Sequence, residues 1–189
     1  MRVIAGSAGG RQLYVPRTDL RPTMDRVKAA IFSSLGEKVI GARVLDLFAG
    51  TGALGIEALS RGASSAVFVE KEARAVETIR RNLEKTKLTG DVRTLDIFSF
   101  LDRRSDAPQT FDIIFADPPY ARSAGERDFT PELLASAPLR HALAPDGIFV
   151  LEKIPGQPLN LGSVWEVLRS RKYGATEVAF LRIAVSAAE

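Results

Sequence analysis

From residue 43 onward, the hydrophobic and polar positions follow two alternating patterns. Short apolar runs typical of buried strands are separated by segments whose apolar residues recur at helical spacing. We expect seven strands, at residues 43–48, 65–70, 92–95, 111–116, 147–152, 164–171 and 177–183. Helices are predicted at residues 54–59, 72–86 and 98–101, and in part at 131–144, where Pro138 forces a break.

Strands and helices that alternate along a chain predict an α/β domain on a mostly parallel sheet with right-handed crossovers. The last two strands are joined by a short connection, so the final strand should run antiparallel. A length of 189 residues suits one domain with a sizeable core, and residues 1–189 are expected to form it.

The first 36 residues precede this pattern and differ from it. Residues 2–5 and 11–15 flank a glycine-rich loop, which predicts a small hairpin that must pack on something to be stable. Residues 20–36 have helical spacing, with Thr23 placed to cap the start and Gly36 to end it. We expect residues 1–36 to be a basic hairpin and helix extension packed on the domain.

Charge is concentrated in the same segment. The chain has a net charge of +3, but residues 1–28 hold six basic residues against Asp19 and Asp25, which leaves +4 there and about −1 elsewhere. Such a footprint suits a polyanion such as nucleic acid, and a solvated basic surface fits almost as well. Cations are unfavourable at a helix N-terminus, so Arg21 and Arg26 favour an anionic partner.

Composition excludes several classes of site. The chain has no cysteine, which removes disulfides, thiolate metal sites and a cysteine nucleophile, and its one histidine, His141, cannot form a histidine metal site. We therefore expect no metal. No apolar run approaches the roughly 20 residues of a membrane span, and the N-terminus lacks the apolar core of a signal peptide, so we expect a cytoplasmic protein.

A glycine turn and three acids follow the first strands. Gly50, Gly52 and Gly55 match the dinucleotide fingerprint, which is a weak signal alone. Asp46, Glu70 and Asp96 lie at the ends of the first, second and third strands, where each could also be a cap or strand-end residue. Because open α/β sheets bind ligands outside the carboxyl ends of their strands, the three acids together predict a cofactor pocket.

The acids also distinguish between cofactors. Asp46 at the mouth of the turn would repel a pyrophosphate but suits a cationic amino group, as in S-adenosylmethionine. Glu70 can accept hydrogen bonds from a ribose diol. Asp96 is placed to meet the adenine amino group, with Ile97 or Phe98 against the ring.

The fourth strand ends in Asp117-Pro118-Pro119-Tyr120. Two prolines fix two φ angles and remove two donors, so the loop is stiff and its carbonyls can accept hydrogen bonds from a ligand. Taken alone, an ordinary strand-terminating turn fits equally well.

Taken together, these motifs resemble those of the amino-methylating, Rossmann-like (class I) S-adenosylmethionine-dependent methyltransferases. The Asp-Pro-Pro-Tyr tetrapeptide is similar to their amine-recognition motif. More narrowly, the sequence is similar to the bacterial 16S ribosomal RNA guanine-N2 methyltransferases in four segments, which are Arg2–Gly6, Gly10-Arg11, Leu20–Lys28 and Leu45–Gly55.

The resemblance implies a cofactor, a partner and a set of site residues. It implies S-adenosylmethionine as the cofactor, ribosomal RNA or an assembling small ribosomal subunit as the partner, and a monomer. The implied cofactor contacts are Asp46, Phe48, Ala49, Gly50, Thr51, Gly52, Glu70, Lys71, Asp96, Ile97 and Asp117. The implied catalytic residues are Asp117, Pro118, Pro119 and Tyr120. The implied RNA contacts are Arg2, Arg11, Arg21, Thr23, Arg26 and Arg122.

The residues suit methylation of an exocyclic amine, whose lone pair is shared with the purine ring. Hydrogen bonds to the Asp117 carboxylate and the Pro118 carbonyl would favour a tetrahedral nitrogen aimed at the methyl group, while Tyr120 stacks on an unpaired or flipped base. An adenine-N6 methyltransferase is the nearest alternative, because the tetrapeptide treats both amines alike. A glutamine methyltransferase, a nucleic-acid-binding module with a decayed site and a dinucleotide oxidoreductase fit less well.

Trp165, His141 and Arg127 lie outside these motifs. Trp165 is expected in the core and His141 at the surface or as a cap. Arg127, in the loop after Tyr120, is either part of a lid over the base or solvated.

Overall fold

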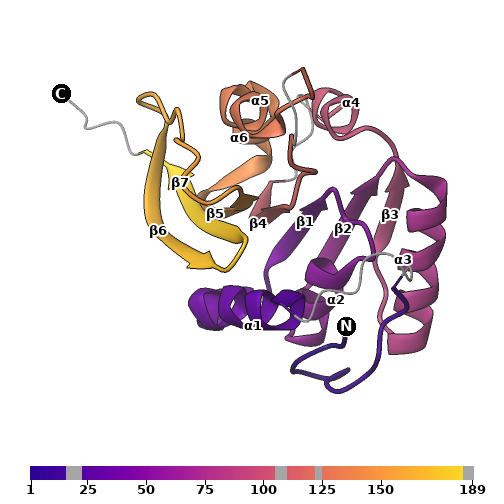
Figure 1. Cartoon of the computed structure of the whole chain (residues 1–189). Helices are drawn as coiled ribbons and strands as arrows, with labels where there is room; N and C mark the ends of the chain where they lie inside the picture. The colour runs from indigo at the N-terminus through magenta and orange to yellow at the C-terminus, as the bar shows by residue number, and fades with distance from the viewer. Residues whose placement is uncertain (16–22, 105–109, 122–124, 185–189) are drawn as a thin grey trace.

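The computed structural model describes residues 1–15, 23–104, 110–121 and 125–184. One seven-stranded sheet, in the order β3-β2-β1-β4-β5-β7-β6, has helices on both faces (Figure 1). The strands are β1 Arg43–Leu47, β2 Ser65–Glu70, β3 Asp91–Thr94, β4 Phe111–Ala116, β5 Leu143–Lys153, β6 Trp165–Tyr173 and β7 Thr176–Ile183. The helices are α1 Thr23–Leu35, α2 Ala53–Ser60, α3 Ala73–Thr86, α4 Ile97–Asp102, α5 Phe129–Ala135 and α6 Ala137–Ala142, with a 3-10 turn η1 at Gly36–Val39.

Strands β1 to β5 are parallel, and β7 runs antiparallel to both β5 and β6. This confirms the predicted α/β class, with seven strands in a mostly parallel sheet and an antiparallel last strand. The bounds of β2 and β4 agree with the prediction residue for residue.

The largest departure lies before the fifth strand. β5 begins at Leu143, so the end of the helix predicted at residues 131–144 belongs to a strand. The predicted break at Pro138 is present, but it lies two residues earlier, at Ser136. The Ser136 Oγ accepts a hydrogen bond from the Leu139 N–H (3.2 Å) and caps α6. Pro138 then lies in the first turn of α6, where its missing N–H costs no hydrogen bond.

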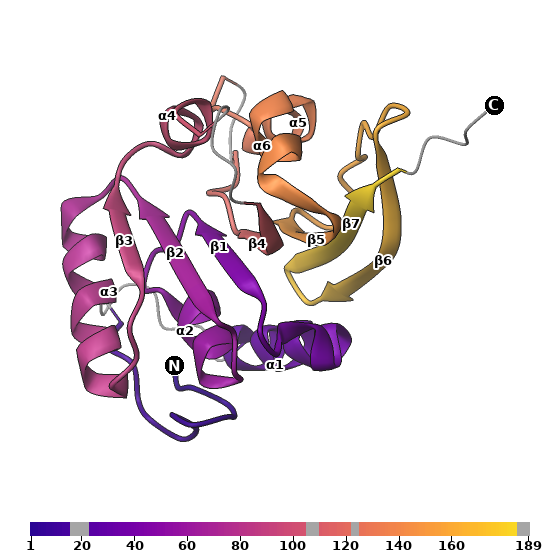
Figure 2. The same ribbon diagram turned by 180° about the vertical axis from the view of Figure 1, so that it is seen from behind.

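The sheet separates two hydrophobic cores (Figures 1 and 2). One face packs against α1, α2 and α3, with Phe32 and Phe115 at its centre. The other packs against α4, α5 and α6 and contains Trp165, whose Nε1 donates to the Leu134 carbonyl (2.8 Å), as expected for a core residue. His141 is exposed at the end of α6, as expected for a surface residue.

The first fifteen residues form a loop that folds back on itself and packs on α2. One antiparallel bridge joins Arg2 and Gln12, and Val3 exchanges backbone hydrogen bonds with Gly10 and Arg11 (both 2.9 Å). Gly6 has a φ of +83°, and a Cβ there would lie 1.8 Å from the Ser60 carbonyl oxygen, so only glycine fits. Residues 2–5 and 11–15 therefore meet as expected for a hairpin, but they form one bridge and no regular strands, because Ile4 and Ala5 donate their N–H groups to Glu57 of α2.

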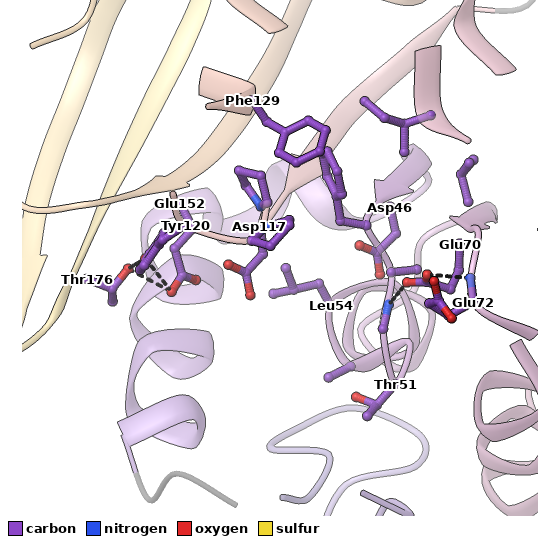
Figure 3. Close-up of a pocket in the computed structure, with 18 of the residues that line it drawn as sticks. Asp46, Thr51, Leu54, Glu70, Glu72, Asp117, Tyr120, Phe129, Glu152 and Thr176 are labelled. Carbon is purple, nitrogen blue, oxygen red and sulfur yellow. Dashed lines mark hydrogen bonds between the residues drawn. The ribbon is translucent and has the colours of Figure 1, made fainter. Parts of the chain in front are cut away.

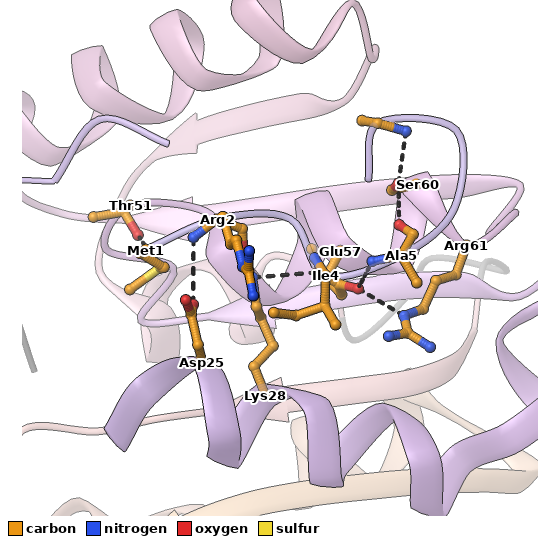
Figure 4. A network of polar contacts seen from close by, with 12 residues as sticks. Met1, Arg2, Ile4, Ala5, Asp25, Lys28, Thr51, Glu57, Ser60 and Arg61 are labelled. Carbon is orange, nitrogen blue, oxygen red and sulfur yellow. Dashed lines mark hydrogen bonds and ion pairs between the residues drawn. The ribbon is translucent and has the colours of Figure 1, made fainter. Parts of the chain in front are cut away.

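Glu57 of α2 anchors this N-terminal loop from a fully buried position (Figure 4). Its carboxylate accepts from the backbone N–H groups of Ile4 (2.7 Å) and Ala5 (3.1 Å) and pairs with Lys28 (3.2 Å) and Arg61 (2.7 Å). Burial lowers the pKa of Lys28, although Glu57 opposes the shift. Lys28 counts toward the basic excess of residues 1–28, but it is neutralised inside the protein and cannot contact a polyanion.

Candidate active site

A cavity of about 820 Å³ opens at the carboxyl ends of the central strands and is bounded on one side by α1 (Figure 3). It brings together most of the predicted cofactor and catalytic residues. Those that line it are Asp46, Phe48, Ala49, Gly50, Thr51, Glu70, Lys71, Asp96, Ile97, Asp117, Pro118, Pro119 and Tyr120. The glycine turn with its neighbouring acids and the Asp-Pro-Pro-Tyr segment therefore line one continuous cavity.

Gly52 is the one predicted cofactor residue that does not line the cavity. It caps α2 with a φ of +76°, and a Cβ there would lie 3.2 Å from the side chains of Ile56 and Ile79. Its conformation lets the turn enter α2 against the core. Its contact with the cofactor stays a prediction.

The glycine turn is fixed from two sides. Glu70 accepts hydrogen bonds from the backbone N–H groups of Gly50 and Glu72 (both 2.9 Å). On the other side, Asn82 of α3 is fully buried, and its amide nitrogen donates to the Thr51 carbonyl (2.9 Å) and the Tyr14 carbonyl (3.1 Å). Sequence reasoning missed Asn82, although a polar residue in the buried stripe of a helix is a usable signal.

Asp46 is almost wholly buried, and its Oδ2 accepts a hydrogen bond from the Gly55 N–H (2.8 Å). Burial raises the pKa of Asp46 to about 7, the Gly55 hydrogen bond opposes the shift, and the nearby Glu70 charge adds to it. A carboxyl group that titrates near neutrality at the cavity wall is poised to respond to a cationic ligand.

Asp96 caps a helix and also lies at the cavity. Its Oδ1 accepts from the N–H groups of Phe98 (3.0 Å) and Ser99 (3.2 Å), which caps α4, and the residue also lines the cavity. The cap fixes the carboxylate at the cavity wall, so the structural role supports the ligand-facing one.

An aromatic wall closes this end of the cavity. Phe129 lies edge-on to Phe48 (5.0 Å between centroids) and stacks on Phe98 (6.5 Å), and the Arg127 guanidinium lies over Phe129 (4.7 Å). Of the two residues expected against an adenine ring, Ile97 is among the cavity-lining residues and Phe98 is not, whereas Phe129 also lines the cavity. Arg127 also pairs with Glu132 (2.6 Å), so it braces this wall.

The other end of the cavity contains the Asp-Pro-Pro-Tyr segment. Asp117 is exposed to the cavity and Pro118 is buried. The Tyr120 hydroxyl lies 2.5 Å from Thr176 Oγ1, 3.3 Å from the Lys153 carbonyl and 3.4 Å from Glu152 Oε1. Burial raises the pKa of Tyr120, so its hydroxyl stays protonated.

Glu152 and Thr176 line the same end, and neither was predicted. Thr176 Oγ1 donates to Glu152 Oε1 (2.7 Å). A signal for Glu152 exists in the sequence, because it lies near the end of a strand, as do the three acids that were predicted.

Of the residues predicted to bind RNA, Arg2, Arg11 and Arg26 are not among those that line the cavity. Arg2 and Arg26 are exposed, whereas Arg11 donates to the Lys85 carbonyl (2.7 Å) near the end of α3. Thr23 is the first residue of α1. Arg21 and Arg122 lie outside the described residues.

The described residues hold neither a metal-binding cluster nor a helix suited to a membrane. No group of three or more acidic or histidine side chains in these parts of the chain could hold a metal ion. In the same ranges, no helix combines the length and apolar character needed to cross a membrane.

Comparisons with known proteins agree with this geometry. The model of the family described as Conserved hypothetical protein 95 matches residues 1–182. The Bacillus subtilis protein YlbH is 38% identical over 187 residues, which cover 96% of this chain and 98% of the relative. Ribosomal RNA small subunit methyltransferase D of Haemophilus influenzae is 33% identical over 178 residues, 92% of this chain and 89% of the relative.

A solved structure adds a ligand complex. It is the Thermus thermophilus 16S rRNA N2 G1207 methyltransferase in complex with AdoMet and guanosine, with a TM-score of 0.68 and 26% identity over 88% of this chain and 44% of that one. The resemblance to class I rRNA methyltransferases expected from the motifs is thereby confirmed. The chain belongs to the Conserved hypothetical protein 95 family, together with relatives that include the small-subunit ribosomal RNA methyltransferases D.

Proposed function

We propose that this protein transfers a methyl group from S-adenosylmethionine to the exocyclic N2 amine of a guanine in 16S ribosomal RNA. The observation that carries the proposal is a single cavity with two chemically distinct ends. Acids and an aromatic wall suit the methyl donor at one end, and Asp117-Pro118-Pro119-Tyr120 suits a planar amine at the other. Relatives named as rRNA methyltransferases support the same enzyme class, cofactor and RNA substrate.

The residues at the first end fit the methyl donor. Asp46 provides a carboxylate for the amino group, Glu70 provides one for the ribose diol, and Asp96 with Ile97 suits the adenine. Phe129 adds an apolar surface for the adenine ring. When bound, S-adenosylmethionine supplies an electrophilic methyl group on a sulfonium.

The second end positions the acceptor amine. The Asp117 carboxylate and the Pro118 carbonyl accept its two N–H bonds, which favours a tetrahedral nitrogen with its lone pair directed at the methyl group. The proton becomes acidic as the new carbon–nitrogen bond forms, so Asp117 need not be a strong base. Tyr120 stacks on the base, and its bonded hydroxyl holds the ring in one orientation.

The base must leave any helix to enter this cavity. The exposed Arg2 and Arg26 support a phosphate-binding role for the N-terminal loop and the start of α1. Such an RNA is met in the cytoplasm, the compartment expected from the sequence.

An adenine-N6 methyltransferase is the second candidate, because Asp117 and Pro118 would accept hydrogen bonds from either amine. Guanine is favoured by the similarity to the T. thermophilus 16S rRNA N2 G1207 methyltransferase, which was solved with AdoMet and guanosine. A dinucleotide oxidoreductase is disfavoured by the buried Asp46 beside the glycine turn.

The test is to map methylated nucleosides in small-subunit ribosomal RNA by mass spectrometry. RNA from a strain without this gene is compared before and after incubation with the protein and S-adenosylmethionine. We expect one guanine to gain an N2-methyl group. A methylated adenine would support the second candidate, and calorimetry that detects NAD binding but no S-adenosylhomocysteine binding would overturn both.

A further inference from the structure

We propose that Glu152 is the residue that selects guanine over adenine, by accepting a hydrogen bond from N1–H of the base beside the amine that Asp117 binds. This inference rests on the proposed function and deepens it. The Asp-Pro-Pro-Tyr segment recognises an exocyclic amine but cannot tell which purine carries it. Selection therefore needs a second group that reads the neighbouring ring position.

Glu152 is next to Asp117 because of the register of the sheet. β4 and β5 are parallel, with Ala116 paired to Leu151, so Asp117 and Glu152 each lie one residue further along neighbouring strands. Such strands are about 4.8 Å apart, and side chains at matching positions point to the same face. Both residues line the cavity, and their carboxylates lie at the same end of it (Figure 3).

The position of Glu152 is fixed by hydroxyl groups. Thr176 has one proton and gives it to Glu152 Oε1 (2.7 Å), so the Tyr120 hydroxyl is the donor in its 2.5 Å contact with Thr176. The ring that stacks on the base and the carboxylate beside it are thus held by one hydrogen-bond chain. Both hydroxyl contacts of Glu152 are to Oε1.

Two adjacent carboxylates match guanine and oppose adenine. The Watson–Crick edge of guanine presents N1–H and the N2 amine as neighbouring donors. Adenine presents its amine beside the bare lone pair of N1, which would face the carboxylate and be repelled by it. A site that hydrogen-bonds a substrate N–H therefore rejects an analogue that lacks the N–H.

The test is a competition between two short RNAs with either guanine or 2-aminopurine at the target position. 2-Aminopurine keeps the N2 amine but has a lone pair at N1. Wild type should strongly prefer guanine, and Glu152→Gln should narrow the ratio of kcat/KM values by about 10- to 100-fold, the value of a hydrogen bond to a charged group. Because both RNAs share one reaction, the ratio does not depend on the fraction of active enzyme.

Thr176→Val is the matched control, since it breaks the link to Tyr120 but keeps the carboxylate. It should slow both substrates equally and leave the ratio unchanged. If Glu152→Gln also slows both equally, Glu152 only positions Tyr120 and the inference is wrong. If Glu152→Gln fails to bind S-adenosylhomocysteine, the same ratio of kcat/KM values is measured on Glu152→Asp instead. If the wild-type protein methylates neither RNA but methylates a third RNA with adenine at the target position, the proposed function itself is overturned.

Discussion

At the scale of single residues, Asp117 combines an exposed carboxylate with a backbone that cannot adjust. It follows the last residue of the buried strand β4, and two prolines fix the chain behind it. Glu70 and Asp46 hold the glycine turn, because they accept hydrogen bonds from the N–H groups of Gly50 and Gly55. The position of Asp117 at the end of β4 supports its proposed role at the acceptor amine.

Replacement of Asp117 by alanine should lower kcat by about 100-fold or more, comparable to removal of one transition-state hydrogen-bond partner in other enzymes. Binding of S-adenosylhomocysteine, measured by calorimetry, should change little. Equal loss of binding and turnover would show that Asp117 acts on the cofactor or the fold rather than on the amine.

Asp46 should make stability depend on pH in the direction opposite to most carboxyl groups. Its pKa is about 7 in the folded protein against 3.8 for an ordinary aspartate, so the folded state holds the proton more tightly than the unfolded state. Stability from this group is greatest below pH 4, falls as the pH rises to about 7 and is constant above. The difference is about 4 kcal/mol at most.

Asp46→Asn removes this titration and can still accept the Gly55 hydrogen bond. In urea unfolding, its stability relative to wild type should rise between pH 4 and pH 7 and then level off. The variant should bind S-adenosylhomocysteine more weakly, because the amino group loses its carboxylate. A constant stability difference across this range would show that Asp46 does not titrate there.

Sequence alone identified Asp117 and Asp46 because each belongs to a local motif, a proline pair or a glycine turn. Glu152, Thr176 and Asn82 were missed because their partners are distant in the chain. Glu152 meets Tyr120 across 32 residues and Thr176 across 24, and Asn82 meets Tyr14 across 68. Only the packed sheet makes such residues neighbours.

At the scale of elements, the buried ion group joins the N-terminal loop, α1 and α2. Glu57→Ala should destabilise the protein by about 3–5 kcal/mol, because it leaves Lys28 without its counter-charge and two backbone N–H groups unpaired. Lys28→Met should cost less, since Glu57 keeps Arg61 and both N–H donors. Urea unfolding of the two variants gives the comparison, and a larger loss for Lys28→Met would contradict it.

The sequence predicted strand bounds correctly for apolar strands inside the sheet. It predicted secondary structure incorrectly where contacts with distant residues determine the backbone conformation. β2 and β4 are apolar central strands and were placed without error. The N-terminal loop has a strand-like pattern, but its polar backbone groups are satisfied by the carboxylate of Glu57 and by Ser60. A local sequence pattern cannot predict a hydrogen-bond partner that lies more than 50 residues away in the chain.

At the scale of the whole molecule, the N-terminal loop and the start of α1 carry two exposed arginines, Arg2 and Arg26. Each is next in the chain to a residue that lines the cavity, Met1 or Val27. Arg26→Ala should weaken RNA binding at all sequences and reduce the slope of log K against log salt by about 0.7–0.9. Arg93 on β3 is the matched control, because it is exposed and pairs with its neighbour Asp91 (2.7 Å). Equal salt slopes for Arg26→Ala, Arg93→Ala and wild type would exclude a phosphate contact at Arg26.

The anchoring of the first fifteen residues has a consequence for the order of folding. Ile4, Ala5 and Tyr14 bind side chains on α2 and α3, between 52 and 68 residues later in the chain. Docking of this segment needs α2 and α3 in place, because these helices carry its hydrogen-bond partners. Because Met1 and Val15 also line the cavity, the same docking completes the cavity wall.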